Sequence, residues 1–335
     1  MIARQHFDNV LNWLTACRRP LLVSHRRPDG DALGALTAMT LTLRALGQDP
    51  RPALFETFPP RYALLRDPVR WYDWKIDGPE LQANCDALVI LDTCTWSQLE
   101  PIAAFVRAAP RTLVIDHHPT PDDIGTRPGD LRLLDDTAAA TCLIILDWLR
   151  AERLPVDPPV ATALLVGLGT DCGWFRYANT DTRALRAAAE LSAAGVMPSA
   201  IYQAVYEQDP PARLRLVGRL LQSLELLAEG RLARMTLRRA DFEAAGADDT
   251  LTEDLVNEAS RLAGLEASVL FVEERDGRVR INLRSKRDLD VATIATQFGG
   301  GGHIRAAGAR LKLPWDEAVA RVTAALVSAL QPRPR

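Results

Sequence analysis

Residues 20–47 read PLLVSHRRPDGDALGALTAMTLTLRALG, and the fold can be worked out from this stretch. Residues 20–25 form a short apolar run with the composition of a strand that is buried on both faces. Residues 31–47 have helical spacing instead, and their apolar positions are Leu33, Leu36, Met39, Leu43 and Leu46. A strand that passes through a polar turn into a helix predicts the first part of a strand–helix–strand unit.

Apolar runs of the same kind recur further along the chain. Residues 86–92 and 111–116 are predicted strands, and residues 137–151, 159–170 and 181–194 have the periodicity of helices. Alternating strands and helices predict the α/β class, with a mostly parallel sheet flanked by helices.

The pattern changes after residues 1–195, which we expect to form the first domain. A connector near residues 196–210 and a helix over 211–230 are predicted to link this domain to a second one, so that 196–230 is the linking segment. The helix has one apolar stripe, which consists of Leu214, Val217, Leu221, Leu224 and Leu227.

Residues 231–335 are predicted to form a smaller α+β domain. Its expected elements are a strand over 231–238, a helix that begins at a capping box of Thr250 and Glu253 and continues to about Leu262, a hairpin that turns at Asp276-Gly277, a helix over 290–297 and a final helix over 315–329. The chain of 335 residues is long enough for two such cores.

Composition argues against several classes of protein. The formal net charge of −3 does not fit a strongly basic protein that coats long nucleic acid. No run reaches the ~18 apolar residues of a membrane span, and the N-terminus lacks the apolar segment of a signal peptide. The five cysteines are scattered without a C-x-x-C pair, as in proteins of a reducing compartment. We therefore expect a cytoplasmic protein that is not bound to a membrane, and we leave a homodimer open.

Acidic and imidazole side chains follow each of the three predicted strands. These residues are His25, Asp29 and Asp31 after the first strand, Asp92 at the end of the second, and Asp116, His117 and His118 at the end of the third. Because the carboxyl ends of parallel strands meet at one edge of a sheet, we expect these side chains to lie together. Asp171, which follows an apolar helix, is a further candidate.

Carboxylates and imidazoles are the ligands that a hard divalent cation prefers, so we expect two metal ions, with Mn²⁺ favoured and Mg²⁺ or Co²⁺ as alternatives. The expected ligands are His25, Asp29 and Asp92 for one ion, and Asp31, His117 and Asp171 for the other, with Asp92 as the bridge. Two ions ~3.5–4 Å apart can activate water for attack on a phosphoryl group.

The simpler interpretation of each acidic residue is a helix cap or a turn residue. Three of the five histidines nevertheless fall at predicted strand ends, which chance explains poorly. Gly30, between Asp29 and Asp31, is expected to let the chain turn sharply, so that each carboxylate faces a metal.

The second domain contains a run of glycines, GGGGHIRAAG, over residues 299–308. The amides of Gly300, Gly301 and Gly302 can approach a ligand closely, with His303 beside them, whereas the simpler interpretation is a flexible turn.

Three segments supply further candidates for substrate binding. Arg284 and Lys286, in LRSKR, could hold a phosphate, although a solvated basic edge of a strand explains them almost as well. Arg176 follows Trp174 and Phe175, whose rings could stack on a base or pack in the core.

Four ordered motifs together resemble the DHH phosphoesterase superfamily, and a fifth resembles its DHH-associated C-terminal domain. The motifs are H-x-x-P-D-G-D-A-x-G from His25, the strand-end Asp92, Asp116-His117-His118, D-x-G-x-F-R-Y-x-N-T from Asp171, and GGGGH-x-x-A-A-G from Gly299. Their order and the chain length look most like the oligoribonuclease/pAp phosphatase (nanoRNase) branch.

This resemblance implies a phosphoesterase with an Mn²⁺-dependent site in the cleft between the two domains. The implied substrates are very short RNAs and 3′-phosphoadenosine 5′-phosphate (pAp). It also implies that Asp92 and His118 are catalytic, with His118 contacting the scissile phosphate or protonating the leaving oxygen. Arg284 and His303 would bind the substrate from the second domain.

Some features depart from the family pattern, and other functions stay open. Cys172, Leu143 and Gln98 stand where the family usually has Thr, Glu and Arg, but none of these changes removes an expected ligand. A phosphodiesterase for linear or cyclic dinucleotides (pGpG, pApA or cyclic di-AMP) is the alternative enzyme. A non-catalytic RNA- or nucleotide-binding descendant is the alternative of another class, although it should have lost metal ligands.

Overall fold

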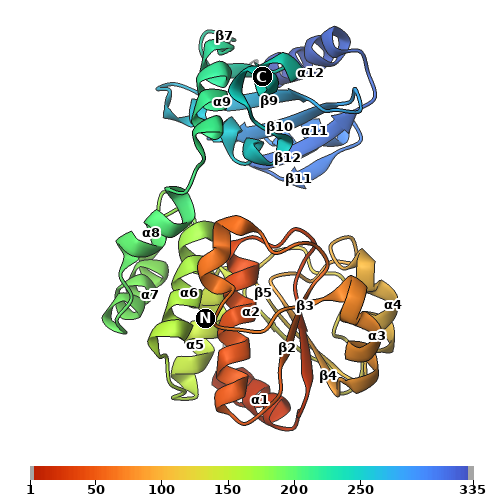
Figure 1. Ribbon diagram of the computed structural model, residues 1–335, viewed down its shortest axis with the longest axis vertical. Coiled ribbons are helices and arrows are strands. Elements are labelled where there is room, and N and C mark those ends of the chain that lie inside the picture. Colours follow the sequence, from red (N-terminus) through yellow and green to blue (C-terminus); the bar gives the residue numbers. More distant parts are fainter. Residues whose placement is uncertain (1–3, 331–335) are drawn as a thin grey trace, which may run out of the picture. The chain divides into compact units, whose positions relative to one another are not determined.

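The computed structural model describes residues 4–330, apart from the side chain of His303. The chain divides into two compact units, of which the first ends at Gln208 and the second begins at Asp209 (Figure 1). The predicted linking segment, 196–230, is therefore divided between the units. Its first part forms α8 (Pro198–Tyr206) and its second part forms α9 (Pro211–Gln222). Among residues 4–330, no helix is long and apolar enough to cross a membrane.

The first unit is built on a six-stranded sheet in which every neighbouring pair is parallel, in the order β3-β2-β1-β4-β5-β6. Its strands are β1 (Pro20–Val23), β2 (Arg51–Leu54), β3 (Tyr72–Asp73), β4 (Ala87–Leu91), β5 (Thr112–Asp116) and β6 (Leu131–Leu134). The three predicted strands are confirmed as β1, β4 and β5, and they are neighbours at the centre of the sheet. The other three strands were not predicted, because β3 has only two residues and because β2 (RPAL) and β6 (LRLL) each include an arginine.

Helices cover both faces of this sheet, as expected for parallel strands with apolar side chains on each face. The helices of this unit are α1 (Arg4–Thr15), α2 (Gly30–Ala45), α3 (Trp74–Asn84), α4 (Ala103–Ala108), α5 (Thr141–Ala151), α6 (Pro158–Asp171), α7 (Thr182–Ala193) and α8, with short 3-10 helices at Pro60–Leu65 and Glu100–Ile102. Of these, α7 and α8 pack against other helices. Leu22, Val89 and Leu113 pack with the core under α2, α5 and α6. Leu21 and Ile90 face the other core, which α3 and α4 cover (Figure 1).

Helices α2 and α6 approach each other closely because glycines lie at the crossing. A Cβ atom on Gly34 would lie 2.4 Å from the carbonyl oxygen of Ala163, and one on Gly30 would lie 2.3 Å from Oγ1 of Thr170. The prediction that Gly30 allows a sharp turn was wrong, because Gly30 is the first residue of α2 and does not have a positive φ. Its lack of a side chain instead lets the start of α2 lie against the end of α6.

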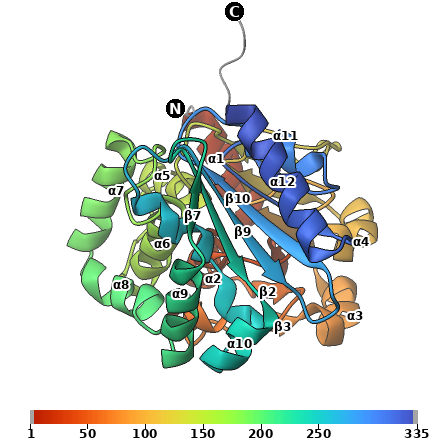
Figure 2. The ribbon, with the colours of Figure 1, turned by 90° about the horizontal axis from the view of Figure 1, so that it is seen from above.

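The second unit contains a mixed six-stranded sheet in the order β11-β12-β10-β9-β8-β7, in which only β8 and β9 pair in parallel. Its strands are β7 (Glu225–Leu227), β8 (Leu232–Leu237), β9 (Ala267–Glu273), β10 (Val279–Ser285), β11 (Gly301–His303) and β12 (Ala306–Leu311). Its helices are α9, α10 (Arg239–Ala245), α11 (Val291–Thr296) and α12 (Trp315–Leu330), and they lie on both faces of the sheet. Figure 2 shows α12 alongside strands β9 and β10, and its apolar side chains belong to the same core as theirs. The predicted hairpin is confirmed as β9 and β10, with Gly277 at φ +80° in its turn.

The helix predicted over 211–230 is shorter than expected, and its buried face is a different one. It ends at Gln222, because the Ser223 hydroxyl accepts the backbone N–H of Thr236 at 2.9 Å and the following residues pair with β8 as β7. Leu216 and Leu220 are fully buried, whereas Leu214 of the predicted stripe is 64% exposed.

The helix predicted from a capping box at Thr250 and Glu253 was also wrong. The segment forms two 3-10 helices, Asp249–Thr252 and Leu255–Arg261, which are separated by Asp254 at φ +61°. The cap is Asp248, whose side chain accepts the backbone N–H of Thr250 at 2.9 Å. A left-handed residue between the two segments prevents a continuous helix.

Candidate metal centre

The sheet of the first unit brings three candidate residues to one edge. His25 lies two residues after β1, Asp92 directly follows β4, and His117 directly follows β5. These strands are adjacent and parallel, so their carboxyl ends meet as predicted. Asp92 has a φ of +63°, a left-handed conformation that Asp tolerates better than most residues. Its side chain is 2% exposed.

Asp29 and Asp31 reach the same edge from the start of α2. Asp29 caps the helix, since its Oδ1 accepts the backbone N–H groups of Asp31 and Ala32 at 3.0 and 3.1 Å. The capping interpretation is therefore correct for Asp29, and the same oxygen also lies 3.8 Å from Nε2 of His25.

The carboxylate of Asp31 is held by the first turn of α5. The backbone N–H of Thr141 donates to Oδ2 at 2.6 Å, and that of Cys142 donates to Oδ1 at 2.9 Å. Unpaired N–H groups and the positive end of the dipole make a helix N-terminus a good site for an anion. Sequence reasoning missed this contact, because 110 residues separate Asp31 from Thr141.

The six expected ligands gather in two groups. Asp31, His117 and Asp171 form one group, and His25, Asp29 and Asp92 form the other; within each, ligand atoms lie within 4.8 Å of one another. The two oxygens of Asp92 face different groups, since Oδ2 lies 3.4 Å from Nε2 of His25 and Oδ1 lies 3.6 Å from Nε2 of His117. Asp171, at the end of α6, lies 3.7 Å from Nε2 of His117.

Backbone carbonyls fix which nitrogen of each histidine faces the carboxylates. Nδ1 of His25 lies 2.9 Å from the carbonyl oxygen of Arg26, and Nδ1 of His117 lies 3.2 Å from that of Ala138. A carbonyl oxygen only accepts, so each Nδ1 carries a proton and donates it. In its neutral form each ring then has a lone pair on Nε2 that can bind a metal, which is the usual arrangement of a ligating histidine.

The electrostatics of this edge fit a cation. Burial, together with the charge of the neighbouring Asp31, raises the pKa of Asp92 well above its usual value. Burial and the charges of Asp31 and Asp29 do the same to the pKa of Asp171. The pKa of His25 is raised by Asp29 and Asp92, although burial opposes its charge. The carboxylates thus repel one another unless positive charge lies between them, so the side chains present fit divalent metal ions.

His118 lies beside these two groups, since its Nδ1 is 4.0 Å from Oδ1 of Asp92, and it forms a third group of possible ligands with Asp92 and His117. Its Nδ1 lies 2.7 Å from Oδ1 of Asp116, which also accepts the backbone N–H of His118 at 3.2 Å. Asp116 is fully buried at the end of β5, whereas the side chain of His118 is 31% exposed. A buried carboxylate that orients a partly exposed imidazole is a common arrangement for proton transfer. The sequence placed Asp116 in a motif but did not assign it this role.

Two of the candidate substrate residues in the second unit are already bonded within that unit. Nε of Arg284 donates to Oδ1 of Asn257 at 3.1 Å, and Nζ of Lys286 donates to the carbonyl oxygen of Ser260 at 2.9 Å. Arg176, in the first unit, is exposed, and its Nε donates to the carbonyl oxygen of Gly173 at 2.8 Å.

The glycine run has a packing role that the sequence did not reveal. A Cβ atom on Gly300 would lie 2.1 Å from the carbonyl oxygen of Gly308, and one on Gly302 would lie 2.4 Å from that of Ala306. These glycines therefore allow the chain to pair closely with β12, and the segment from Gly301 is a strand instead of a flexible turn. A Cβ atom on Gly301 would meet open space. The side chain of His303 lies outside the described part of the structure.

The residues that depart from the expected motifs are not among the six that gather at the centre. Cys172 and Leu143 are buried in the core next to it. Gln98 contributes its carbonyl oxygen, which accepts the backbone N–H of Arg26 at 3.2 Å in the loop after β1.

The fold and this edge together define a class of proteins with a strand-end acidic site in the first domain and a mixed sheet in the second. Residues 20–168 match the DHH family, N-terminal domain, and residues 240–331 match the DHHA1 domain. The chain is 33% identical to the bifunctional oligoribonuclease and PAP phosphatase NrnA of Thermus thermophilus, over 95% of this chain and 92% of that one. The chain therefore belongs to the DHH family, in the branch that contains this relative.

Other relatives differ in how much of their length the chain covers. The protein with the same description from Bacillus subtilis is 28% identical over 89% of this chain and 90% of its own length. A cyclic-di-AMP phosphodiesterase, GdpP of Geobacillus thermodenitrificans, is 26% identical over 87% of this chain but only 44% of its own length.

Solved structures confirm the fold. An exopolyphosphatase-related protein from Bacteroides fragilis superimposes with a TM-score of 0.91, at 23% identity over 98% of this chain and 97% of that one. RecJ of Thermus thermophilus, solved in complex with Mn²⁺, gives a TM-score of 0.52 at 14% identity over 99% of this chain and 55% of that one.

Proposed function

We propose that this protein hydrolyses phosphoester bonds in short oligoribonucleotides and in pAp, releasing mononucleotides. The chain is a phosphoesterase, as its relatives named oligoribonuclease and PAP phosphatase indicate. One observation carries the proposal: the six side chains that the sequence singled out form two adjoining groups around the carboxylate of Asp92.

The proposed cofactors are two divalent ions. His25, Asp29 and Asp92 would hold one ion, and Asp31, His117 and Asp171 the other, with Asp92 shared. Mixed carboxylate and imidazole ligands favour Mn²⁺, while Mg²⁺ and Co²⁺ stay open. Such ions, when bound, neutralise phosphoryl charge and lower the pKa of water that attacks it.

The protein's own side chains account for positioning and proton transfer. The backbone of α5 fixes Asp31, and the Thr141 hydroxyl donates to Oδ1 of Asp92 at 2.9 Å, so both carboxylates keep one orientation. His118, held by Asp116, is proposed to contact the scissile phosphate or to protonate the leaving oxygen.

Several residues are proposed to bind the substrate. They are Arg176 in the first unit, and Arg284, Lys286, His303 and the amides of Gly300, Gly301 and Gly302 in the second. Asn257 and the carboxylate of Asp254, whose Oδ1 lies 4.0 Å from the Arg284 guanidinium, hold Arg284 in place, and Lys286 is held by the carbonyl oxygen of Ser260. Both cations are thus positioned to contact a phosphate.

Two features of the protein's setting are also proposals. All five cysteines are free, which suits a reducing compartment such as the cytoplasm. A homodimer stays a prediction that size-exclusion chromatography with light scattering would test.

A dinucleotide phosphodiesterase is the second candidate. The match to GdpP of Geobacillus thermodenitrificans favours it, since the same two-domain region makes up 44% of a cyclic-di-AMP phosphodiesterase. A non-catalytic descendant fits less well, because all six candidate ligands are present and lie together.

The experiment compares substrates in one assay. Purified protein with Mn²⁺ is incubated with ribonucleotides of two to five residues, pAp, pGpG, cyclic di-AMP and pyrophosphate, and products are separated by chromatography. Rapid turnover of short RNA and pAp is expected, and Asp92→Asn, which tolerates the positive φ, should lose it while folding normally. If neither short RNA nor pAp is hydrolysed, the proposed function is rejected. Faster hydrolysis of cyclic di-AMP than of these substrates would select the dinucleotide phosphodiesterase.

A further inference from the structure

A pocket of about 760 Å³ lies on the surface of the first unit, in the segment between the end of α6 and the end of α8. Its lining includes Trp174, Arg176, Met197, Tyr202, Tyr206 and Glu207. We call it the aromatic pocket. Its volume lies within the range of roughly 300–1,000 Å³ that small-molecule sites occupy.

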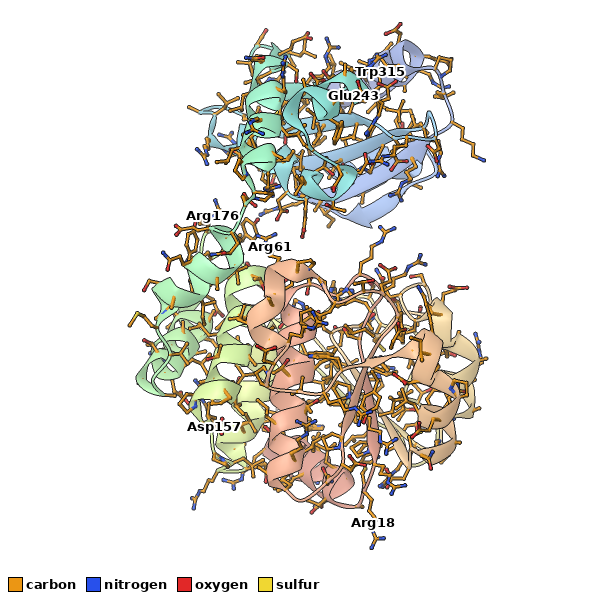
Figure 3. The ribbon with its side chains drawn as sticks, viewed as in Figure 1. Arg18, Arg61, Asp157, Arg176, Glu243 and Trp315 are labelled. Carbon is orange, nitrogen blue, oxygen red and sulfur yellow. The ribbon has the colours of Figure 1, made fainter. Side chains whose placement is uncertain are left out.

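Three aromatic rings form one side of the pocket. The ring centroid of Trp174 lies 5.4 Å from that of Tyr202 and 6.0 Å from that of Tyr206, and the two tyrosine centroids are 5.0 Å apart. The guanidinium of Arg61 lies 4.6 Å from the ring centroid of Tyr206. Figure 3 shows Arg61 and Arg176 at the same end of the first unit. Tyr202 keeps 37% of its surface exposed, so a planar ligand can reach it.

The backbone places Trp174 here at a conformational cost. Gly173, Trp174 and Phe175 have φ values of +55°, +55° and +63°, and left-handed conformations are unfavourable for the two aromatic residues. The indole also needs a glycine beneath it, because a Cβ atom on Gly169 would lie 2.5 Å from the ring. Strain of this kind concentrates at functional sites.

The aromatic pocket is tied to the candidate metal centre by a short piece of chain. Trp174 follows Asp171 by three residues, so their Cα atoms can be no more than about 11 Å apart. The amide of Asn179 donates to the carbonyl oxygens of Asp171, at 3.2 Å, and of Ala139, at 3.1 Å. It thus joins this segment to the loop that carries the carbonyl acceptor of His117.

We infer that the aromatic pocket binds a nucleobase of the substrate by stacking, next to the phosphate that is cleaved. The inference rests on the proposed function and names a binding subsite for it. Every base has a flat π face, so stacking on Tyr202 and Trp174 holds any of the four bases. The exposed Arg176 guanidinium can stack on the base or contact the phosphate, while Gln203 and Glu207 offer polar atoms to the edge of the base.

The test separates the base from the rest of the nucleotide. Dissociation constants for AMP and for ribose 5-phosphate are measured by isothermal titration calorimetry with Mn²⁺, using the full chain and its Tyr202→Leu and Tyr202→Phe variants. Ile76→Ala is the matched control, because Ile76 is 77% exposed on α3 and lies outside the pocket. Melting followed by circular dichroism checks that each variant is folded.

AMP should bind the wild type more tightly than ribose 5-phosphate by roughly 5- to 150-fold, the amount that one stacked base contributes. Tyr202→Leu should reduce this ratio at least fivefold, while Tyr202→Phe and Ile76→Ala keep it. A ratio near one in the wild type, or an unchanged ratio in Tyr202→Leu, would overturn the inference even if short RNA is cleaved. The expected ratios without cleavage of short RNA or pAp would instead reject the proposed function and leave the base subsite standing.

Discussion

The hydroxyl of Thr141 offers a way to perturb the candidate metal centre without touching any of its six candidate ligands. Oγ1 of Thr141 donates to Oδ1 of Asp92 at 2.9 Å, and both residues are buried. Thr141→Val replaces the hydroxyl by a methyl group of similar size. The backbone N–H that Thr141 donates to Asp31 is unchanged, so the substitution removes one hydrogen bond from one carboxylate.

The size of the effect follows from the charge of the acceptor. A hydrogen bond to a charged group contributes about 1.5–3 kcal/mol, and the loss of a group that supports a metal ligand typically weakens metal binding about 10- to 100-fold. That loss of affinity corresponds to about 1.4–2.7 kcal/mol of binding free energy. We therefore expect Thr141→Val to raise the Kd for Mn²⁺ by this factor and to reduce the Mn²⁺-dependent rise in Tm.

The assay is calorimetric titration of the metal-free protein with Mn²⁺, together with melting curves with and without the ion. Thr40→Val is the matched control, because the Thr40 hydroxyl is buried in α2 without a hydrogen-bond partner in the described part of the chain. Thr40→Val should leave Mn²⁺ binding unchanged and be neutral or stabilising. Thr141→Ser should restore binding. Equal Mn²⁺ affinities in Thr141→Val and Thr40→Val would show that the hydroxyl does not support the centre.

Three further predictions concern packing and thiol chemistry. Gly302→Ala should lower the free energy of unfolding, measured in urea, by about 1–3 kcal/mol, because the φ of Gly302 is +143° and a Cβ atom would clash with strand β12. The control Gly301→Ala should change this free energy by less than about 0.5 kcal/mol, because a Cβ atom there meets open space. Gly167→Ala should cost about 1–3 kcal/mol because a Cβ atom would overlap a buried thiol, while Gly218→Ala, in open space on α9, should stabilise by up to about 1 kcal/mol. Burial raises the pKa of Cys17 to about 11, so only about one Cys17 thiol in a thousand is ionised at pH 8. The rate of alkylation of Cys17 should therefore increase about tenfold for each pH unit up to pH 10. A rate that levels off below pH 9 would contradict this prediction.

The centre could be predicted from the sequence to the extent that it depends on strand ends. The three central strands are apolar on both faces, and parallel pairing then places His25, Asp92 and His117 at one edge whatever the rest of the fold does. The residues that orient these ligands could not be found in this way. The two N–H groups of α5 that hold Asp31 come from a helix about 110 residues away, and only the packing of α2 on α5 brings them into reach.

Errors occurred where two patterns compete in the same stretch. The α9 segment has apolar residues at 214, 216, 217, 220 and 221, so two helical stripes can be drawn through it. Which stripe is buried depends on the sheet that the helix covers, and the structure buries Leu216 and Leu220. The glycine run posed a similar problem. Its glycines are needed because strand β12 packs closely against them. The sequence does not show how closely the two segments approach.

The buried carboxylates at the carboxyl ends of β1, β4 and β5 repel one another, which destabilises the fold but favours the binding of cations. Asp31 is satisfied by N–H groups, and Asp29 by the start of its own helix, so these two carboxylates are held in place without a cation. Asp92 accepts the Thr141 hydroxyl, but the pKa of Asp92 and that of Asp171 are both raised by burial and by the charge of Asp31. Nε2 of His25 and Nε2 of His117 face these carboxylates, because Nδ1 of each ring lies against a carbonyl oxygen. A protein that only needed stability could replace these side chains with apolar ones, as buried ionic groups often can be replaced. Here hydrogen bonds to backbone groups and to the Thr141 hydroxyl fix the orientation of the carboxylates and imidazoles. Their remaining oxygen and nitrogen atoms face the centre, as a preformed site for divalent ions requires.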